Sequence, residues 1–248
     1  MIRVDDLHKS FGSQKVLKGV NLDFVKGKIT TIVGTSGCGK TVLLKHLNAL
    51  LLPDRGAVLV DGVDITKLRQ KELYEMRGRF GVLFQGAALL DSMTIFDNVA
   101  FPLREKTEMS ETGIRKKVDE RLDQVGLEGM GYKFPAELSG GMRKRAGLAR
   151  ALVTDPEIVL FDEPTTGLDP ILASSIHQLI ARTQRAFGYT GVVVSHTIPQ
   201  VFDISDYVAI LANGVIVEAK PANEFQASQN PVVQQFIRGE TEGPIHVL

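Results

Sequence analysis

The sequence predicts an α/β protein that carries an inserted helical region. Short runs rich in aliphatic and β-branched residues predict buried strands, and they cover residues 29–33, 80–84, 157–161 and 191–195. Residues from about 89 to 130 show no strand pattern. Within that region, apolar residues recur at helical spacing from Ser110 to Gly126. We therefore expect strands and helices around a core, interrupted by a helical subdomain.

Both ends of the chain add antiparallel strands to this prediction. Residues 2–7 and 20–25 alternate apolar and polar side chains, as half-buried strands do, and Ser10–Gln14 predicts a turn between them. Asn213-Gly214 lies between two apolar runs and predicts a hairpin. Residues 232–237 predict a short helix, and the polar last ten residues have no assignment.

Composition limits the classes of protein that remain. The 248 residues carry 29 Lys+Arg and 29 Asp+Glu, so the formal net charge is zero, which gives no support for nucleic acid as the main partner. No apolar run approaches the roughly 20 residues of a membrane-spanning helix, and the first residues lack the apolar core of a signal peptide. The one cysteine, Cys38, excludes an intrachain disulfide. We expect a cytosolic protein, which can still dock on a membrane protein.

One stretch fits a phosphate-binding loop. The pattern G-x-x-x-x-G-K-[ST] is met by Gly34, Thr35, Ser36, Gly37, Cys38, Gly39, Lys40 and Thr41. A predicted strand precedes the loop and a run of helix formers follows it. Loop N–H groups and the helix dipole favour phosphate, while Lys40 is expected to reach the β- and γ-phosphates and Thr41 to bind Mg²⁺. The sequence thus predicts a nucleoside triphosphate site rather than an ordinary glycine-rich turn.

Polar side chains with metal or proton chemistry follow two other predicted strands. Asp162 and Glu163 end the strand at 157–161, where packing alone does not favour two carboxylates. In a phosphate-loop protein the first can hold Mg²⁺ through water and the second can accept a proton from attacking water; the alternative is an acidic turn. Gln85, after the strand at 80–84, is either a Mg²⁺ ligand or a polar loop residue.

Two ring side chains have two interpretations each. Phe11 is either a core residue, which its type alone favours by about two to one, or a platform on which a base stacks. His196 follows the strand at 191–195. A lone histidine is usually structural, but at the end of that strand it can contact a γ-phosphate and sense its loss.

Two further helix starts stand out. Ser139 is a good N-cap, and Gly140 and Gly141 leave the first-turn N–H groups open to an anion. This helix is predicted to run to Val153, and its basic residues predict a solvated cationic face: Arg143, Lys144, Arg145 and Arg150. Asp169 and Pro170 start the second helix. Its predicted buried face consists of Leu172, Ile176, Leu179, Ile180 and Thr183.

Taken in order, these motifs resemble those of the ATPase subunit of ABC transporters. They are similar to its Walker A, Q-loop, signature, Walker B, D-loop and H-loop, which correspond to the phosphate loop, Gln85, Leu138–Met142, Ile158–Glu163, Gly167–Asp169 and His196. The resemblance covers residues 2 to about 221. It implies a P-loop NTPase fold within residues 1–239, with a RecA-like core, an N-terminal antiparallel β subdomain and a helical subdomain at about 89–153, followed by a tail at 240–248.

The resemblance also implies a role for each matching residue. Glu163 resembles the general base and His196 the switch that holds the γ-phosphate, and Lys40 and Gln85 complete the catalytic set. Phe11 resembles the aromatic that stacks on adenine, which reverses the preference for a core role. Mg²⁺ would be bound by Thr41, Gln85 and Asp162. ATP would contact Phe11, the whole loop through Val42, and, from a second copy of the chain, Ser139, Gly140 and Gly141, with Asp169 near that interface.

The local sequence of three segments suggests a subgroup of this family. Met142–Arg150, Phe84–Leu90 and Phe96–Leu103 are similar to the Mla type of ATPase, which serves phospholipid transport between bacterial membranes. This implies a permease partner contacted through the segment after Gln85, a periplasmic lipid-binding subunit, a small cytosolic accessory subunit, and a location at the cytoplasmic side of the inner membrane. Gly167-Leu168-Asp169 departs from the more usual Ala-Leu-Asp.

Other functions remain open at this point. Another ABC transporter, for an amino acid, a metal or a drug, shares the same motifs, and Met142 with the basic run after it argues against it only weakly. A soluble ABC-type ATPase acting on ribosomes or DNA often has tandem domains or zinc cysteines, which one phosphate loop and one cysteine do not provide. A small-molecule kinase or GTPase leaves the Ser139-Gly140-Gly141 helix start unexplained, and the chain has no N-K-x-D guanine motif.

Overall fold

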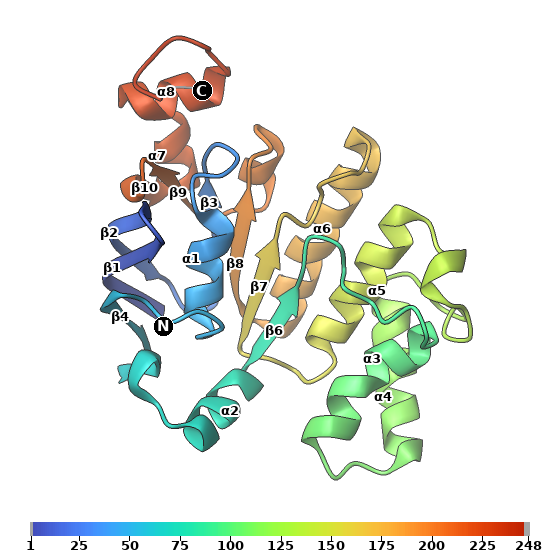
Figure 1. Cartoon of the computed structure of the whole chain (residues 1–248). Helices are drawn as coiled ribbons and strands as arrows, with labels where there is room; N and C mark the ends of the chain where they lie inside the picture. Colours follow the sequence, from blue (N-terminus) through green and yellow to red (C-terminus); the bar gives the residue numbers. More distant parts are fainter. Residues whose placement is uncertain (1, 246–248) are drawn as a thin grey trace. The chain divides into compact units, whose positions relative to one another are not determined.

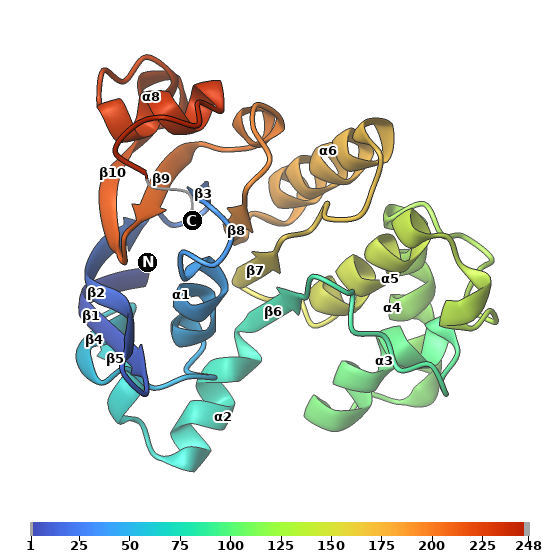
Figure 2. The ribbon, with the colours of Figure 1, turned by 45° about the horizontal axis from the view of Figure 1, so that its top comes forward.

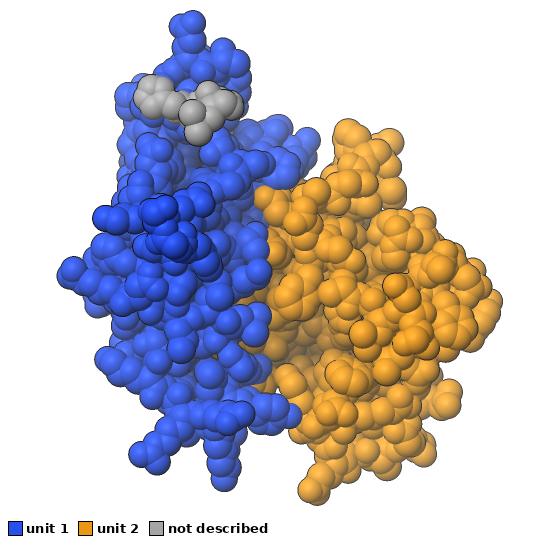
Figure 3. Space-filling view, in the orientation of Figure 1, with its two compact units in different colours: residues 1–77, 190–248 blue, residues 78–189 orange. Residues whose placement is uncertain are grey.

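The computed structural model describes residues 2–245, so the last three residues of the predicted tail lie outside the described part. The chain divides into two compact units (Figure 3). Unit 1 consists of residues 1–77 and 190–248, and unit 2 consists of residues 78–189. The helical region predicted at about 89–153 belongs to unit 2.

Unit 1 contains an antiparallel sheet with the strand order β2-β1-β4-β5 (Figure 2). Its strands are β1 (Ile2–Phe11), β2 (Gln14–Phe24), β4 (Arg55–Val60) and β5 (Val63–Asp64). The first two were predicted as shorter strands with a turn at 10–14, which is wrong in extent. Register shifts within the β1–β2 ladder interrupt the alternation of side chains while backbone pairing continues to Phe11 and Gln14.

A second set of strands in unit 1 is centred on β3 (Ile29–Val33), which pairs in parallel with β8 (Thr190–Ser195) and with β9 (Tyr207–Ala212). Every residue of β3 and β8 is buried, as the apolar runs predicted. β10 (Val215–Pro221) pairs antiparallel with β9. The predicted hairpin turn is confirmed, because Asn213 and Gly214 have φ values of 52° and 84°, the positive angles of a type I′ turn.

The helices of unit 1 are short. α1 (Lys40–Leu47) follows the loop and lies alongside β8 (Figure 1). The sequence pattern did not indicate α2 (Gln70–Gly78), because none of its residues is buried and it has no apolar stripe. The remaining helical elements are η1 (Ile65–Lys67), η3 (Gln200–Asp203), α7 (Ala222–Gln226) and α8 (Pro231–Arg238). The predicted helix around 232–237 is therefore confirmed as α8.

Unit 2 combines two parallel strands with a group of helices. β6 (Phe80–Leu83) pairs with β7 (Ile158–Asp162). α3 (Ile95–Lys106), α4 (Glu111–Gln124) and α5 (Gly140–Leu152) pack on one another (Figure 1), and η2 (Pro135–Glu137) precedes α5. The amphipathic helix predicted from Ser110 to Gly126 is confirmed as α4.

α6 (Pro170–Phe187) completes unit 2 and begins where the sequence predicted. Asp169 caps it by accepting hydrogen bonds from the N–H groups of Ile171 and Leu172 at 2.9 and 3.0 Å. Its predicted buried face is confirmed except at Leu172, which is 40% exposed. Leu172 lies in the first turn, so the buried face begins with Ala173 and Ile176.

The segment after α8 turns back onto that helix. The buried side chain of Gln235 donates hydrogen bonds to the main-chain oxygens of Glu240 and Ile245, at 3.3 and 3.0 Å, and accepts one from the Ile245 N–H at 2.7 Å. Ile245 packs in an apolar cluster with residues of β3, β9, α7 and α8: Val33, Val208, Ile210, Phe225 and Val233. Residues 240–245 are therefore part of the folded unit.

The Gln235 contacts make a measurable prediction. Gln235→Leu keeps the volume but leaves the main chain of Ile245 without these partners, so we expect the free energy of unfolding to fall by about 1–3 kcal/mol. Chemical denaturation measures this change, and hydrogen exchange at Ile245 should become faster. Gln226→Leu, at an exposed position, is the control and should stay within about 0.5 kcal/mol of wild type. Equal effects of the two variants would contradict the prediction.

Candidate functional site

The phosphate-loop residues connect β3 to α1 in unit 1 with a backbone that needs glycine. Gly34 has a φ of 154°, and a Cβ there would lie 2.8 Å from the Cys38 Sγ. Gly39, the N-cap of α1, has a φ of 106°, in the left-handed region that favours glycine. The first-turn N–H groups of α1 therefore open directly onto the loop.

Lys40 spans this loop. Its side chain is buried, and its Nζ donates hydrogen bonds of 2.9 Å to the main-chain oxygens of both Gly34 and Thr35. Lys40 follows the loop in sequence, and its ammonium group is held by the carbonyls of the first two loop residues. The side chain therefore reaches back across the loop. A positive charge, a helix N-terminus and glycine N–H groups in one place suit phosphate oxygens. Thr41 follows as the second residue of α1, so the residues present fit a nucleotide phosphate chain with its metal.

His196 lies at the same edge of the strands as the loop. Ser195 of β8 pairs with Val33 of β3, so His196 and Gly34 leave two neighbouring parallel strands at the same level. A cavity of about 510 Å³ is lined by Thr35, His196 and residues of α8 and the segment after it. The structure therefore brings His196 and the loop together, as sequence order alone could not show.

Phe11 is not a core residue. Its side chain is 46% exposed at the end of β1, so the core interpretation is wrong. The Lys9 ammonium lies over the ring, 5.7 Å from its centroid. An exposed aromatic face next to a cation remains available for stacking.

The two predicted carboxylates lie at the end of β7 in unit 2. Asp162 and Glu163 are each only 8% exposed. Glu163 has a φ of 47°, a left-handed conformation that is uncommon for a residue with a side chain and is often found at functional sites. Its carboxylate accepts a hydrogen bond from the Thr166 hydroxyl at 3.3 Å.

Gln85 emerges beside this carboxylate pair. Leu83 of β6 pairs with Phe161 of β7, so Gln85 follows its strand at the edge where Asp162 ends the other. The Gln85 side chain is exposed. The parallel ladder therefore places the predicted Mg²⁺ ligands of unit 2 at one edge, and both offer oxygen atoms of the kind that Mg²⁺ prefers.

The start of α5 lies near the start of α6. Ser139 is exposed and caps α5, accepting a hydrogen bond from the Met142 N–H at 3.3 Å. A Cβ on Gly140 would meet the Leu168 side chain at 3.5 Å. Residues 139–141 and Asp169 therefore lie close together in unit 2, with Asp169 serving as a helix cap.

The basic residues of α5 do not form the predicted solvated face. Lys144 is 6% exposed, and the four cations bind main-chain or side-chain oxygens within unit 2. Arg145 donates to the Val125 main-chain oxygen and to the Ser175 hydroxyl, both at 2.7 Å. The prediction was wrong because it considered only the charge of Lys144. Helical spacing puts this residue on the same face as the buried Leu148.

Burial also changes the acid–base properties of Lys144. Removal from water lowers the pKa of its ammonium group, and the nearby Asp162 and Glu163 carboxylates oppose this shift. The lysine therefore lies within the electrostatic field of Asp162, the predicted Mg²⁺ ligand, and Glu163, the predicted base.

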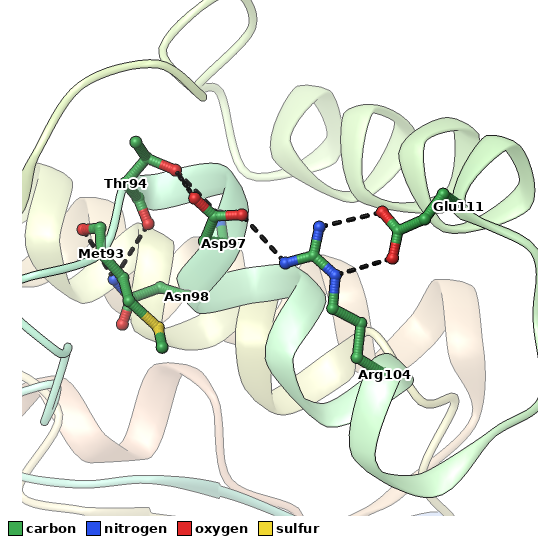
Figure 4. Close-up of polar contacts among 6 residues, drawn as sticks. All are labelled: Met93, Thr94, Asp97, Asn98, Arg104 and Glu111. Atoms are coloured by element: carbon green, nitrogen blue, oxygen red, sulfur yellow. Dashed lines mark hydrogen bonds and ion pairs between the residues drawn. The ribbon is translucent and has the colours of Figure 1, made fainter.

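The segment after Gln85 is fixed by a buried asparagine of α3 (Figure 4). Asn98 accepts a hydrogen bond from the Leu90 N–H at 2.7 Å and donates one to the Leu90 main-chain oxygen at 3.0 Å. It also donates to the main-chain oxygens of Met93 and Thr94, at 3.2 and 3.0 Å, and Figure 4 shows these two contacts. This residue was not singled out from the sequence. The buried amide in a run of loop carbonyls shows why an asparagine occupies this apolar face.

Charged contacts join the starts of α3 and α4. Arg104 binds Glu111 through two bonds of 2.9 Å and Asp97 through one of 2.9 Å (Figure 4). Hydrogen bonds from the Thr94 hydroxyl and from Arg104 hold the pKa of Asp97 below its ordinary value. These exposed contacts orient the helices around the segment after Gln85 rather than form a reactive site.

The loop, the helix that starts on it and the carboxylates at a strand end define a nucleoside triphosphatase of the phosphate-loop class. A sequence profile described as ABC transporter matches residues 17–166, and the chain belongs to that family. As an ABC ATPase it binds ATP with Mg²⁺ and hydrolyses it. The fold and the cofactors expected from the resemblance are thereby confirmed.

Relatives match nearly the whole chain. The probable ribonucleotide transport ATP-binding protein mkl of Mycobacterium leprae is 48% identical over 98% of this chain and 70% of its own length. The intermembrane phospholipid transport system ATP-binding proteins MlaF of Haemophilus influenzae and Escherichia coli K12 are 45% and 41% identical. Each covers 99% of this chain, with 93% and 91% of its own length aligned.

Solved structures agree on the fold. A dimeric ATP-binding cassette in a post-hydrolysis state, bound to ADP and Pi, aligns with a TM-score of 0.82 and 32% identity over 90% of this chain and 99% of its own. The protein cbiO1 of Clostridium perfringens, part of an ABC transporter complex, aligns with a TM-score of 0.84 and 30% identity over 97% of this chain and 94% of its own.

The position of Lys40 leads to a prediction for nucleotide binding. Lys40→Ala removes the ammonium group from the loop, and we expect the affinity for Mg-ATP to fall roughly 10- to 100-fold, as loss of a charged hydrogen bond implies. Titration with a fluorescent ATP analogue measures the change. Lys45→Ala removes an exposed lysine of the same helix and should leave the affinity unchanged. Wild-type affinity in Lys40→Ala would show that the loop does not bind phosphate in this way.

Proposed function

We propose that this ABC ATPase powers phospholipid transport between two bacterial membranes. The observation that carries the proposal is the similarity to the two intermembrane phospholipid transport ATPases, which extends over 99% of the chain and more than nine-tenths of each relative. The relatives thus match the helical subdomain and the segment after Gln85 as well as the nucleotide-binding motifs. Surface segments of this kind are where contacts with partner subunits are expected.

The binding of Mg-ATP and its hydrolysis are each assigned to particular residues. Lys40 and the loop N–H groups bind phosphates, Thr41, Gln85 and Asp162 bind Mg²⁺, and Glu163 accepts the proton of the attacking water. His196 holds the γ-phosphate and Phe11 stacks on adenine. The burial of Glu163 at the end of β7, beside Asp162, supports its role as the base, since a carboxylate held in a fixed position can accept a proton from an attacking water.

A second copy of the chain completes the assembly. Ser139, Gly140 and Gly141 act on the ATP held by that copy, and Asp169 lies at the interface between them. Ile171, in the turn after Asp169, is 82% exposed. An exposed aliphatic side chain in the turn after Asp169 supports contact with another protein surface. The dimeric cassette with a similar fold supports the same arrangement.

The remaining partners lie at the membrane. No helix within residues 2–245 is long and apolar enough to span a bilayer. We infer from the resemblance to transporter ATPases that a permease supplies the pathway and that the ATPase binds it from the cytoplasmic side. The segment fixed by Asn98, after Gln85, is the contact surface. A periplasmic lipid-binding subunit and a small cytosolic accessory subunit complete the transporter, as the resemblance to the Mla type implies.

A second substrate has an observation in its favour. The Mycobacterium leprae relative, 48% identical to this chain, is named a probable ribonucleotide transport protein. Because the ATPase itself does not bind the transported molecule in a permease-based system, its sequence is compatible with either substrate. The co-purification experiment described below distinguishes them.

The assignment of the base predicts the behaviour of one variant. Glu163→Gln keeps the shape but cannot accept a proton, so we expect ATP hydrolysis to fall by roughly 100-fold or more while binding persists. An ATP-bound dimer should accumulate, and size-exclusion chromatography with light scattering should detect it. Asp203→Asn, at an exposed position of η3, is the control. Hydrolysis at the wild-type rate in Glu163→Gln would refute the assigned role.

The transport class is tested with native membranes. We expect an affinity pull-down of the full chain after gentle solubilisation to recover a permease, a periplasmic lipid-binding protein and phospholipid, all identified by mass spectrometry. Recovery of a permease with a solute-binding protein and bound ribonucleotide would replace phospholipid by the second substrate. Ribosomes or DNA-repair proteins without a permease would refute the transport role.

A further inference from the structure

Lys144 connects two loops whose side chains belong to the proposed catalytic site. It lies on α5 in the second turn after Ser139. Its Nζ donates hydrogen bonds to the main-chain oxygen of Gln85 and, at 3.5 Å, to that of Glu163. One buried ammonium group therefore lies between the backbone that carries Gln85 and the backbone that carries Glu163.

Arg150, farther along the same helix, holds the next residues of this loop. It donates hydrogen bonds of 2.7 Å to the main-chain oxygens of Ala87 and Ala88. Both alanines have left-handed backbone conformations, with φ values of 61° and 49°, so their carbonyls point in directions that ordinary extended chain would not provide. Lys144 and Arg150 of α5 thus both donate hydrogen bonds to main-chain oxygens of the turn at residues 85–88.

The helix approaches this turn closely. A Cβ on Gly147 would lie 2.8 Å from Leu83 Cδ1 and 3.1 Å from the Ala87 Cβ. Glycine at 147 therefore lets α5 approach the end of β6 and the turn directly, between Lys144 on one side and Arg150 on the other. The contact combines close packing with charged hydrogen bonds, which makes the position of the turn relative to α5 specific.

The chemistry of these contacts requires a cation at 144. Without Lys144 the Gln85 carbonyl loses a charged donor, and so does the Glu163 carbonyl, which also accepts a hydrogen bond from the Thr166 N–H at 3.3 Å. A lysine can serve both carbonyls because it offers three donors on a long stem. The neighbouring Asp162 and Glu163 carboxylates stabilise the same charge. A neutral apolar side chain of equal length fills the space but supplies neither the hydrogen bonds nor the charge.

We infer that Lys144 is a positioning residue for ATP hydrolysis, which fixes the backbone of Gln85 and Glu163 at a set separation through its two carbonyl contacts, assisted by Arg150. The inference rests on the proposed roles of Gln85 as a metal ligand and Glu163 as the base. Because Ser139 caps α5, the helix that presents residues 139–141 also holds both of these loops. A displacement at the start of α5 is then transmitted to both of them.

Lys144→Met is the first test, in the purified full chain with Mg-ATP. We expect kcat to fall roughly 10- to 100-fold, the effect of a misplaced catalytic group, with little change in affinity for a fluorescent ATP analogue. Hydrogen exchange in residues 84–90 should become faster. Lys144→Arg retains a cation and should recover part of kcat. Lys116→Met removes an exposed lysine of α4 and should match wild type in every measurement.

Arg150→Met provides a second variant, since its side chain is only partly buried and Lys144→Met risks a folding defect. We expect faster exchange in residues 84–90 and a smaller fall in kcat. Wild-type kcat in either variant, despite faster exchange, would overturn the inference, as would a fall in kcat that Lys144→Arg and Lys144→Met share equally. Glu163→Gln in the same assay separates the two proposals. If that variant is active, the assigned base is wrong; if it is inactive while Lys144→Met is active, only the positioning role is wrong.

Discussion

Parallel strand pairing is the constraint from which each half of the site follows. In unit 1, the pairing of Val33 with Ser195 brings the phosphate loop and His196 to one edge. In unit 2, the pairing of Leu83 with Phe161 does the same for Gln85 and Asp162. Because loops leave parallel strands at their carboxyl ends, residues distant in sequence meet there without contacts of their own. The chemistry depends on backbone hydrogen bonds before it depends on any functional side chain.

The sequence predicted best what is locally determined. The apolar run at 29–33 is a buried strand because its aliphatic and β-branched side chains suit no other environment, and the loop after it needs glycine at Gly34 and Gly39 because of their backbone angles. The caps at Ser139 and Asp169 follow from side-chain oxygens that satisfy first-turn N–H groups. For these residues, the conformation that the local sequence favours is the one that the fold requires.

Residues that depend on tertiary contacts were not predicted. Lys144 was expected in water because a run of cations on a helix is usually a solvated face, whereas its burial depends on loop carbonyls and carboxylates from distant segments. Residue type alone favoured a core position for Phe11, and only the resemblance reversed that preference; the side chain lies at the exposed end of β1. α2 buries no residue and so has no hydrophobic pattern to detect. In each case, burial or exposure depends on contacts with residues remote in sequence, or on the lack of such contacts, which a local pattern does not record.

The contact between Gln235 and the end of the chain bears on how this region can diverge among relatives. Gln235 recognises main-chain atoms of Glu240 and Ile245, which are the same for every amino acid. The side chains at 240–242 and 244 can therefore vary without changing the path of the chain. Gly243 cannot be replaced, since a Cβ there would lie 2.5 Å from the Gln235 Cδ. Position 245 must remain apolar, because Ile245 packs in the apolar cluster. Three positions thus specify a terminal segment whose other residues are free to drift in evolution.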